Sequence, residues 1–176
     1  MAWRDAIELE PVVDAAGQER LAALAGEIWR EYWPAHLGVA QTEYMVEQLQ
    51  SLEAIVRDMR DHAYEYWFAH AADDGRVVGY TGGHVEPETD RFFISKIYLL
   101  APERGRGFAR AIIEAYDELL CDRGLKAMYL TVNKYNELGI RAYRGCGFTT
   151  IDAVETDIGS GFVMDDYIME RSTSCA

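Results

Sequence analysis

The chain has 176 residues and a mass of 19.9 kDa, which is the size of one domain with its own hydrophobic core. A composition of 49% hydrophobic and 27% charged residues excludes a disordered or collagen-like chain. The formal net charge of −13 argues against a general attraction to nucleic acid or to an anionic membrane, and it favours a small cationic substrate. We therefore expect a single domain over residues 1–176, with neither nucleic acid nor membrane as a partner.

The cysteines and histidines show no pattern of a disulfide scaffold or of a metal site. Cys121, Cys146 and Cys175 are an odd number without a Cys-x-x-Cys pair, so we expect neither a disulfide framework nor a zinc ribbon. The four histidines lack metal-ligand spacing, and no metal is expected. Arg4 and Asp5 stand where a signal peptide needs an apolar run, and no segment approaches the roughly 18 apolar residues of a membrane span. A reducing, cytoplasmic location is the resulting expectation.

The first third of the chain predicts one strand and several helices. Residues 7–12 alternate apolar and polar side chains, which is typical of a strand. Apolar residues recur at helical spacing over residues 21–32, and we expect Pro34 to end that helix. Two further helices follow, one with Thr42 and one with Ser51 as the predicted N-cap residue.

The rest of the chain predicts a β-meander followed by alternating elements. The predicted strands are residues 64–71, 76–85, 92–100, 127–132, 148–158 and 162–170. A helix over residues 108–119, which Gly124 ends, and a short helix over residues 136–144 lie between the later strands. This order of elements indicates a mixed sheet of the α+β or α/β class.

The segment from Ile97 to Arg110 carries the strongest chemical signal. A buried strand runs directly into a turn rich in Gly and Arg, and that turn opens a helix. Gly105 and Gly107 let the backbone approach a ligand closely, and successive N–H groups at a helix N-terminus form an anion site. The segment lacks the Gly-Lys-Ser/Thr ending of a P-loop and the third Gly of a dinucleotide motif. It therefore predicts a phosphate or pyrophosphate site, with positive charge from Arg104, Arg106 and Arg110.

The pattern Arg-x-x-Gly-x-Ala at residues 104–109 resembles the acyl-CoA pyrophosphate loop of the GNAT superfamily of N-acetyltransferases. A second stretch resembles the same superfamily: Leu-Thr-Val at residues 130–132, then Asn136, then Tyr143 followed by Gly147-Phe148. Both motifs occur in the family's order and spacing. The resemblance covers roughly residues 64–170, and the ending looks like a bacterial branch near the spermidine/spermine-type acetyltransferases.

The resemblance implies a single α+β domain with a mixed, seven-stranded sheet, flanked by about four helices and splayed between a bulged fourth strand and the fifth. It implies that the pantetheine arm of acetyl-CoA lies in this gap along Ile97, Tyr98 and Leu99, where the Leu99 N–H polarises the thioester carbonyl. Asn136 would bond the pantetheine arm, and it also suits a helix cap. The pyrophosphate would lie on Arg104, Gly105, Arg106, Gly107, Phe108, Ala109 and Arg110.

Tyr143 matches the family's general acid, which protonates the departing thiolate. The general base is open, because residues 93–96 hold no carboxylate where many family members have a Glu. Glu86, His84 or a chain of waters are the alternatives. Asp165 and Asp166 are adjacent on a strand and face opposite sides, so they cannot form a pair, although one could reach the acceptor.

The acceptor side of the cleft is expected near an aromatic-rich region of the first two helices, comprising Trp29, Tyr32, Trp33, His36, Gln41 and Tyr44. Ordinary helix packing explains each of these residues equally well. The resemblance thus implies acetyl transfer from acetyl-CoA to a primary amine, such as a small cationic metabolite or polyamine. A protein or peptide amine and a non-catalytic CoA-binding sensor are the alternatives, and the resemblance allows a homodimer.

Overall fold

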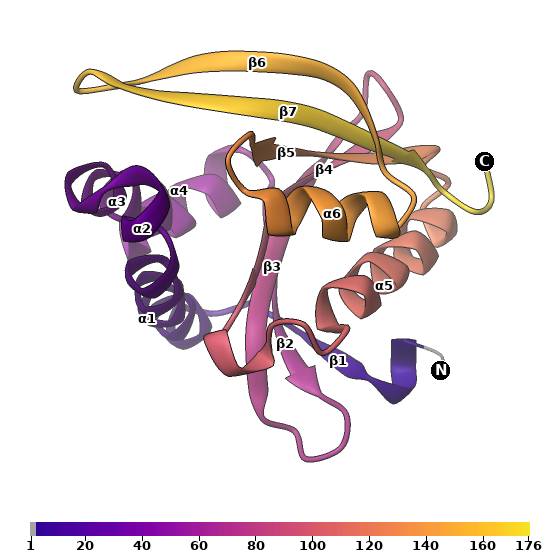
Figure 1. The fold of residues 1–176 in the computed structure, drawn as a ribbon. Coiled ribbons are helices and arrows are strands. Elements are labelled where there is room, and N and C mark those ends of the chain that lie inside the picture. Colours follow the sequence, from indigo (N-terminus) through magenta and orange to yellow (C-terminus); the bar gives the residue numbers. More distant parts are fainter. Residues whose placement is uncertain (1–2) are drawn as a thin grey trace.

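A mixed sheet of seven strands runs through the computed structural model, which describes residues 3–176 (Figure 1). The strand order is β1-β2-β3-β4-β5-β7-β6, and every neighbouring pair is antiparallel except β4 and β5. The strands are β1 (Ile7–Pro11), β2 (Glu65–Ala71), β3 (Val77–Glu86), β4 (Arg91–Leu99), β5 (Ala127–Asn133), β6 (Thr149–Gly159) and β7 (Phe162–Ser172). The α+β class and the seven-stranded mixed sheet are confirmed.

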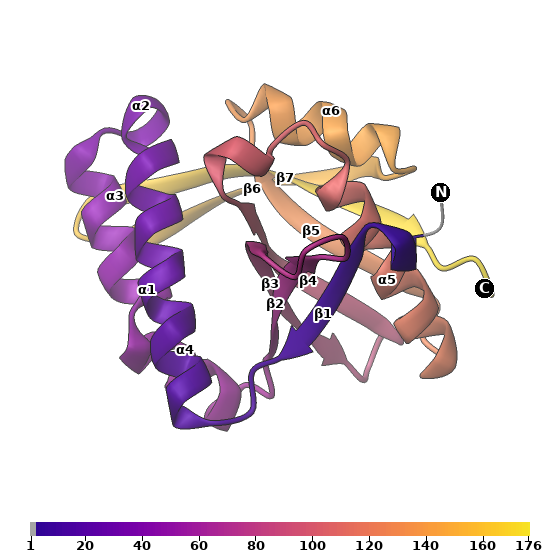
Figure 2. The same ribbon diagram turned by 90° about the horizontal axis from the view of Figure 1, so that it is seen from below.

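Six α-helices flank the sheet within residues 3–176, where about four were expected. They are α1 (Ala15–Tyr32), α2 (Pro34–Leu37), α3 (Val39–Met45), α4 (Leu52–Asp61), α5 (Phe108–Asp122) and α6 (Glu137–Gly145). Short 3₁₀ turns lie at Trp3–Asp5 and Ala101–Glu103, and a π turn lies at Val46–Gln50. Helices α1 to α4 gather on one side of the central strands, and α5 lies on the other (Figures 1 and 2). None of the described helices combines the length and the apolar composition that crossing a membrane requires.

The helix boundaries follow from local capping chemistry, with one error in our expectations. The Ser51 hydroxyl accepts from Ala54 N at 3.2 Å and caps α4, as predicted. Thr42 caps nothing: it lies inside α3, where its hydroxyl donates to the Gly38 carbonyl at 2.8 Å. Pro34 follows the end of α1 but also begins α2, since proline is well suited to the first turn of a helix.

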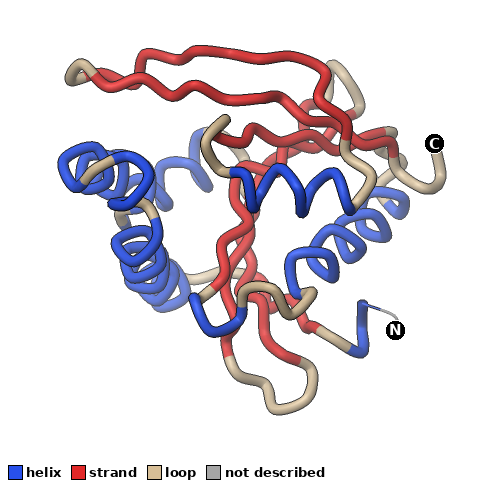
Figure 3. The backbone as a smooth tube through the Cα atoms, in the orientation of Figure 1, coloured by secondary structure: helices blue, strands red, loops and turns tan. Residues whose placement is uncertain are grey.

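Strands β4 and β5 separate along most of their length, which Figure 3 shows as two diverging red segments. They pair only where Arg91–Phe93 lie beside Ala127–Tyr129. Beyond this point β5 pairs with β7, and β4 pairs with β3 alone. The splayed pair of strands is therefore confirmed, and it opens a gap in the middle of the sheet.

A bulge in β4 decides which side chains face this gap. Gly82 pairs with Lys96 and Gly83 pairs with Ile94, so Ser95 is an extra residue without a partner. Because of this extra residue, Ile94 packs in the core under α5, whereas Lys96 lies on the opposite face over the rings of Tyr64 and Tyr66. The bulge thus puts a basic side chain on the face that α1 and α4 cover.

Cys121 at the end of α5 and Cys175 in the C-terminal tail form a disulfide, with Cα atoms 5.7 Å apart. We did not expect this bond, since an odd count of cysteines with 54 residues between the two offers no sequence signal. Strand β7 pairs with β5 and returns the tail to α5, where Ser174 N donates to the Asp117 carboxylate at 3.0 Å. Cys146 is free and half-buried at the end of α6, between two glycines.

Candidate active site

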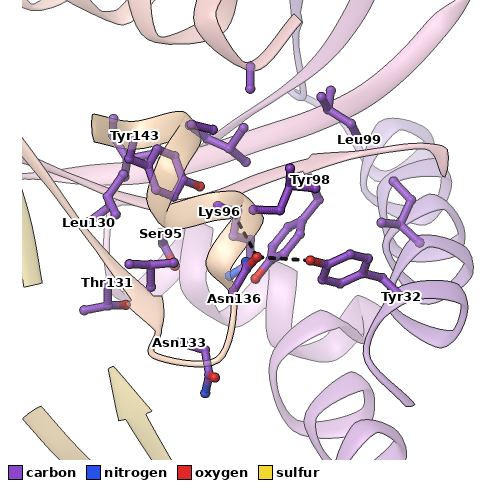
Figure 4. Close-up of a pocket in the computed structure, with 18 of the residues that line it drawn as sticks. Tyr32, Ser95, Lys96, Tyr98, Leu99, Leu130, Thr131, Asn133, Asn136 and Tyr143 are labelled. Atoms are coloured by element: carbon purple, nitrogen blue, oxygen red, sulfur yellow. Dashed lines mark hydrogen bonds between the residues drawn. The ribbon is translucent and has the colours of Figure 1, made fainter. Parts of the chain in front are cut away.

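A cavity of about 690 Å³ occupies the gap between β4 and β5 (Figure 4). Its wall includes the last two-thirds of β4, the end of β5 and the first turn of α5. Helix α1 closes one side and α6 closes the other. This volume is within the range of small-molecule sites, and the cavity joins elements that are far apart in the sequence.

Every residue predicted to bind acetyl-CoA, together with the predicted acid Tyr143, lines this cavity, with one exception. The lining includes Ile97, Tyr98, Leu99, Arg104, Gly105, Gly107, Phe108, Ala109, Arg110, Asn136 and Tyr143. Arg106 lies outside it, and its half-exposed guanidinium forms an ion pair with Glu103 at 2.7 Å. The roles of these residues stay predictions, but the fold brings all the others to one place.

The loop before α5 has the geometry of an anion site. Gly105 and Gly107 have φ angles of +77° and +91°, in the left-handed region that favours glycine. A Cβ atom at either position would meet nothing within 4 Å, so the space in front of the loop is open. Gly107 begins α5 without a side-chain cap. The first N–H groups of this helix therefore lack internal acceptors and point, with the positive end of the helix dipole, toward the cavity.

Two arginines fix this loop to its surroundings. Arg104 pairs with Glu31 on α1 at 2.5 Å, donates through Nε to the Leu99 carbonyl at 3.1 Å, and lies over the Tyr32 ring. Arg110 donates to the carbonyl of Gly145 on α6 at 2.8 Å. Each guanidinium keeps further N–H donors, so both can contribute positive charge while they hold the loop in position.

The free edge of β4 presents backbone donors to the cavity. Leu100 N donates to the Val78 carbonyl on β3 at 3.0 Å. Since alternate N–H groups of a strand point to opposite sides, the N–H of Leu99 points away from β3 and into the gap. The arrangement can therefore offer this N–H to a carbonyl oxygen that acquires negative charge.

Helix α6 carries Tyr143, whose side chain lines the same gap. Asn136 caps the helix, because its Oδ1 accepts from Gly139 N at 2.9 Å and also from the Tyr32 hydroxyl at 3.0 Å. The Tyr143 ring packs edge-to-face against Phe148, with centroids 5.9 Å apart. Burial raises the pKa of Tyr143 above its usual value, so the hydroxyl keeps its proton at neutral pH.

The model of the acetyltransferase (GNAT) family matches residues 25–148. The chain belongs to the GNAT family. It is 31% identical over 80 residues to the uncharacterized N-acetyltransferase YycN of Bacillus subtilis, covering 44% of this chain and 51% of YycN. It is 30% identical over 102 residues to mycothiol acetyltransferase of Thermomonospora curvata, covering 53% of this chain and 33% of that protein. The chain thus spans about half or less of the length of these curated relatives.

Two solved structures show the GNAT fold over nearly the whole chain. The PaiA N-acetyltransferase of Thermoplasma acidophilum, solved with coenzyme A, has a TM-score of 0.74 and 20% identity over 94% of this chain and 98% of its own. The spermidine/spermine N-acetyltransferase SpeG of Vibrio cholerae has a TM-score of 0.67 and 18% identity over 98% of this chain and 96% of its own. At this level of identity the likeness shows the shared fold.

The aromatic-rich segment of this GNAT chain divides into two sets. Trp29, Tyr32 and Trp33 line the cavity, and Trp29 contacts both Trp33 and Tyr98 with ring centroids 5.3 Å apart. The other three predicted residues lie outside the lining: His36 packs on Tyr32, while Gln41 and Tyr44 contact the β6–β7 hairpin.

Two hydrogen bonds join α3 to the β6–β7 hairpin. The Tyr44 hydroxyl donates to the Ile158 carbonyl at 2.7 Å, and Gln41 donates to the Val163 carbonyl at 3.3 Å. Figure 1 shows the tip of the hairpin lying on the side of α3. Helix α3 and the hairpin therefore form one continuous wall.

Sequence reasoning missed Lys96 and Asp58, which both line the cavity. Lys96 is 5% exposed, with its Nζ atom 5.3 Å from the Tyr64 ring centroid and 5.4 Å from that of Tyr66. Burial lowers the pKa of Lys96 to about 8, although the charge of Asp58 opposes this fall. For Lys96, the sequence signal that could have indicated a site residue was a single lysine in an otherwise apolar strand. Asp58, on α4, had none.

The two residues that the sequence offered as general bases lie outside the lining of the cavity. Glu86 accepts from the Tyr129 hydroxyl and pairs with Arg91 at 3.3 Å. Burial acts to raise the pKa of Glu86, but the bond from Tyr129 and the charge of Arg91 outweigh it and lower the pKa overall. His84 packs between the rings of Tyr64 and Phe93.

Proposed function

We propose that this GNAT protein transfers the acetyl group of acetyl-CoA to the primary amine of a small molecule by direct attack. The observation that carries the proposal is that three features needed for this reaction line one cavity. The anion loop before α5, the free edge of β4 and the Tyr143 hydroxyl follow one another on its wall. A long thioester with a diphosphate at its far end has this same order of groups.

The residues present fit acetyl-CoA. Gly105 and Gly107 leave room for a diphosphate in front of the N–H groups of α5. The unpaired edge of β4 suits the amides of a pantetheine arm. The Oδ1 atom of Asn136 already accepts hydrogen bonds from Gly139 N and the Tyr32 hydroxyl. The Nδ2 group of Asn136 has no partner among the described residues and can donate to a carbonyl of the pantetheine arm.

The proposed chemistry requires a donor for the carbonyl oxygen and an acid for the sulfur. The Leu99 N–H stabilises the oxyanion that forms when the amine attacks the thioester. The C–S bond then breaks, and Tyr143 gives its proton to the thiolate. The ordinary pKa values of tyrosine and thiols are about 10 and 8.5, and burial raises the pKa of Tyr143 further, so its hydroxyl holds the proton until the departing sulfur takes it.

A small acceptor is supported by the wall that α3 and the β6–β7 hairpin form together. The contacts of Gln41 and Tyr44 hold the hairpin against α3. The net charge of −13 favours a cationic acceptor such as a polyamine. Relatives and neighbours have names that refer to mycothiol, L-2,4-diaminobutyric acid and spermidine, so their names do not single out one acceptor.

A panel of acceptors tests this function through the release of free thiol from acetyl-CoA. The panel contains spermidine, short diamines, diamino acids, acidic amino acids and a peptide with a free N-terminus. We expect the fastest release with small cationic amines, and weaker discrimination in high salt because the attraction is partly screened. Faster release with the peptide or with an acidic amine would contradict the proposal, and tight binding of acetyl-CoA without any transfer would favour a sensor.

The neighbour SpeG is described as dodecameric in one solved structure. A homodimer of the present chain is a separate proposal, and sedimentation of the purified protein tests it. A monomer at micromolar concentration would contradict it.

A further inference from the structure

Asp166 on β7 is a carboxylate buried in the wall of the cavity. The side chain is 4% exposed, and its Oδ1 atom has no hydrogen-bond partner among the described residues. Buried carboxylates are costly unless they are paired or hydrogen-bonded, so such an oxygen in a cavity wall points to a ligand with N–H donors. Two indole N–H groups on the same wall, those of Trp29 and Trp33, are also buried and have no partner within residues 3–176.

Asp166 is close to the expected reaction centre. Burial raises the pKa of Tyr98 most strongly, and the nearby Tyr143 and Asp166 raise it further, so the Tyr98 hydroxyl lies near both groups. All three side chains line the cavity, and Figure 4 shows Tyr98 and Tyr143 projecting into it from β4 and α6. The carboxylate and the predicted acid therefore both lie near one tyrosine of the cavity wall.

We propose that Asp166 receives the ammonium group of the acceptor and takes up the proton that this group loses before it attacks the thioester. The proposal rests on the acetyl transfer proposed above. Strand β4 has no carboxylate that could act as the general base. In this proposal β7, on the other side of the splayed gap, provides it. The substrate class that it implies is a primary amine that enters the cavity as a cation.

The surroundings leave Asp166 charged at neutral pH and still able to accept a proton. Burial, followed by the charge of Asp165, raises its pKa to about 6, while Lys134 and hydrogen bonding by Asn133 oppose the rise. On β6 the opposite residue is Val154, which carries no charge. The titratable and charged groups near it are Asp165, Lys134, Tyr98 and, beyond Tyr98, Tyr143.

The protons balance over one turnover. The ammonium R–NH₃⁺ gives one proton to Asp166, and the nitrogen lone pair forms the C–N bond with the thioester carbon. The C–S bond then breaks, the sulfur takes the Tyr143 proton, and the second nitrogen proton returns to the Tyr143 oxygen. The products are a neutral amide, a thiol and one proton, which leaves from Asp166 to solvent.

Asp165 is a matched control for Asp166 on the same strand. It faces the other side of β7, is about one-third exposed, and forms an ion pair with Lys134. It is absent from the cavity lining. Neutralising either residue removes the same charge from the protein, so a difference between the two variants reports on the cavity and not on net charge.

The test compares wild type, Asp166→Asn and Asp165→Asn with the best amine of the panel, from pH 5.5 to 9. We expect Asp166→Asn to lower kcat/KM by about 10²–10⁴-fold and to lose the fall in activity below about pH 6, while the affinity for acetyl-CoA stays within twofold. Asp165→Asn is expected to stay within about threefold of wild type. We also expect added formate to restore part of the activity of the Asp166→Ala variant. A purely structural role of Asp166 does not predict this rescue.

Three results would overturn the inference. One is an Asp166→Asn variant with the rate and pH profile of wild type, and another is an equal loss in Asp165→Asn. The third is an inactive, folded Asp166→Ala that formate does not rescue. A wild-type protein that acetylates no amine would instead overturn the proposed function, and the role of Asp166 with it.

Discussion

The hydroxyl of Tyr32 on α1 donates a hydrogen bond to Oδ1 of Asn136 at the start of α6, across 104 residues of sequence and 3.0 Å of space (Figure 4). The same oxygen accepts from Gly139 N at 2.9 Å and caps α6. One amide oxygen thus links the aromatic wall of the cavity to the helix that carries Tyr143. The position of the predicted acid depends on this link.

Asn136→Ala removes both bonds, and Tyr32→Phe removes only the bond between the helices. We expect Asn136→Ala to lower the free energy of unfolding by about 1–2 kcal/mol, mainly through the lost cap, and Tyr32→Phe by about 1 kcal/mol or less. Asn136→Asp keeps an acceptor oxygen for both bonds and serves as the control. Urea unfolding measures the three differences, and equal stability of Asn136→Ala and Asn136→Asp would contradict the role of the cap.

Gly107→Val is expected to weaken acetyl-CoA binding at least about tenfold, because a side chain there projects into the space in front of the first N–H groups of α5. Arg106→Ala is expected to change the affinity less than about threefold, since Arg106 lies outside the cavity lining. Titration calorimetry measures both.

Gly124→Val is the control for backbone strain in this experiment. Gly124 also has a positive φ, of +71°, and open space around it, but it lies at the other end of α5. A loss of affinity in Gly124→Val equal to that in Gly107→Val would show that strain, and not the blocked loop, is responsible.

Tyr143→Phe keeps the ring that packs on Phe148 and removes the proton. We expect the single-turnover rate of acetyl transfer to fall by about 10²–10⁴-fold, while the melting temperature and the acetyl-CoA affinity stay unchanged. Tyr135→Phe, at an exposed tyrosine outside the cavity lining, is the control and is expected to be fully active. Retained activity with unchanged melting would remove Tyr143 from the mechanism.

Lys96→Met is expected to stabilise the protein near neutral pH. The folded-state pKa of about 8 is below the ordinary 10.5, so burial disfavours the charged form, by about 3 kcal/mol. This cost is complete below pH 8, fades as the pH rises toward 10.5, and is absent above it. Loss of the contacts with Tyr64 and Tyr66 offsets about 1 kcal/mol of the gain.

The melting temperature of Lys96→Met is therefore expected to exceed that of wild type by several degrees at pH 7.5, and the difference is expected to shrink by pH 10. Thermal unfolding of both proteins across this range checks the sign. A difference that grows with pH would mean that Lys96 is stabilised in its charged form.

Much of the molecule follows from signals within a few residues of each element. The alternation at residues 7–12 predicts β1, Ser51 caps α4, and the glycines at 105 and 107 mark the turn into α5, because such features depend on neighbouring dihedral angles and hydrogen bonds. The motifs at residues 104–109 and 143–148 likewise needed no structure to indicate the family.

Other features depend on how distant segments meet, and only the tertiary structure decided them. In a regular strand Lys96 would share the face of Ile94 under α5, but the extra residue Ser95 shifts it to the face that α1 and α4 cover. Asp166 enters the cavity because β7 pairs with β5 beside the gap, and the same pairing returns Cys175 to Cys121. Sheet order and register are set by the packing of the whole chain, which a local pattern of residues does not contain.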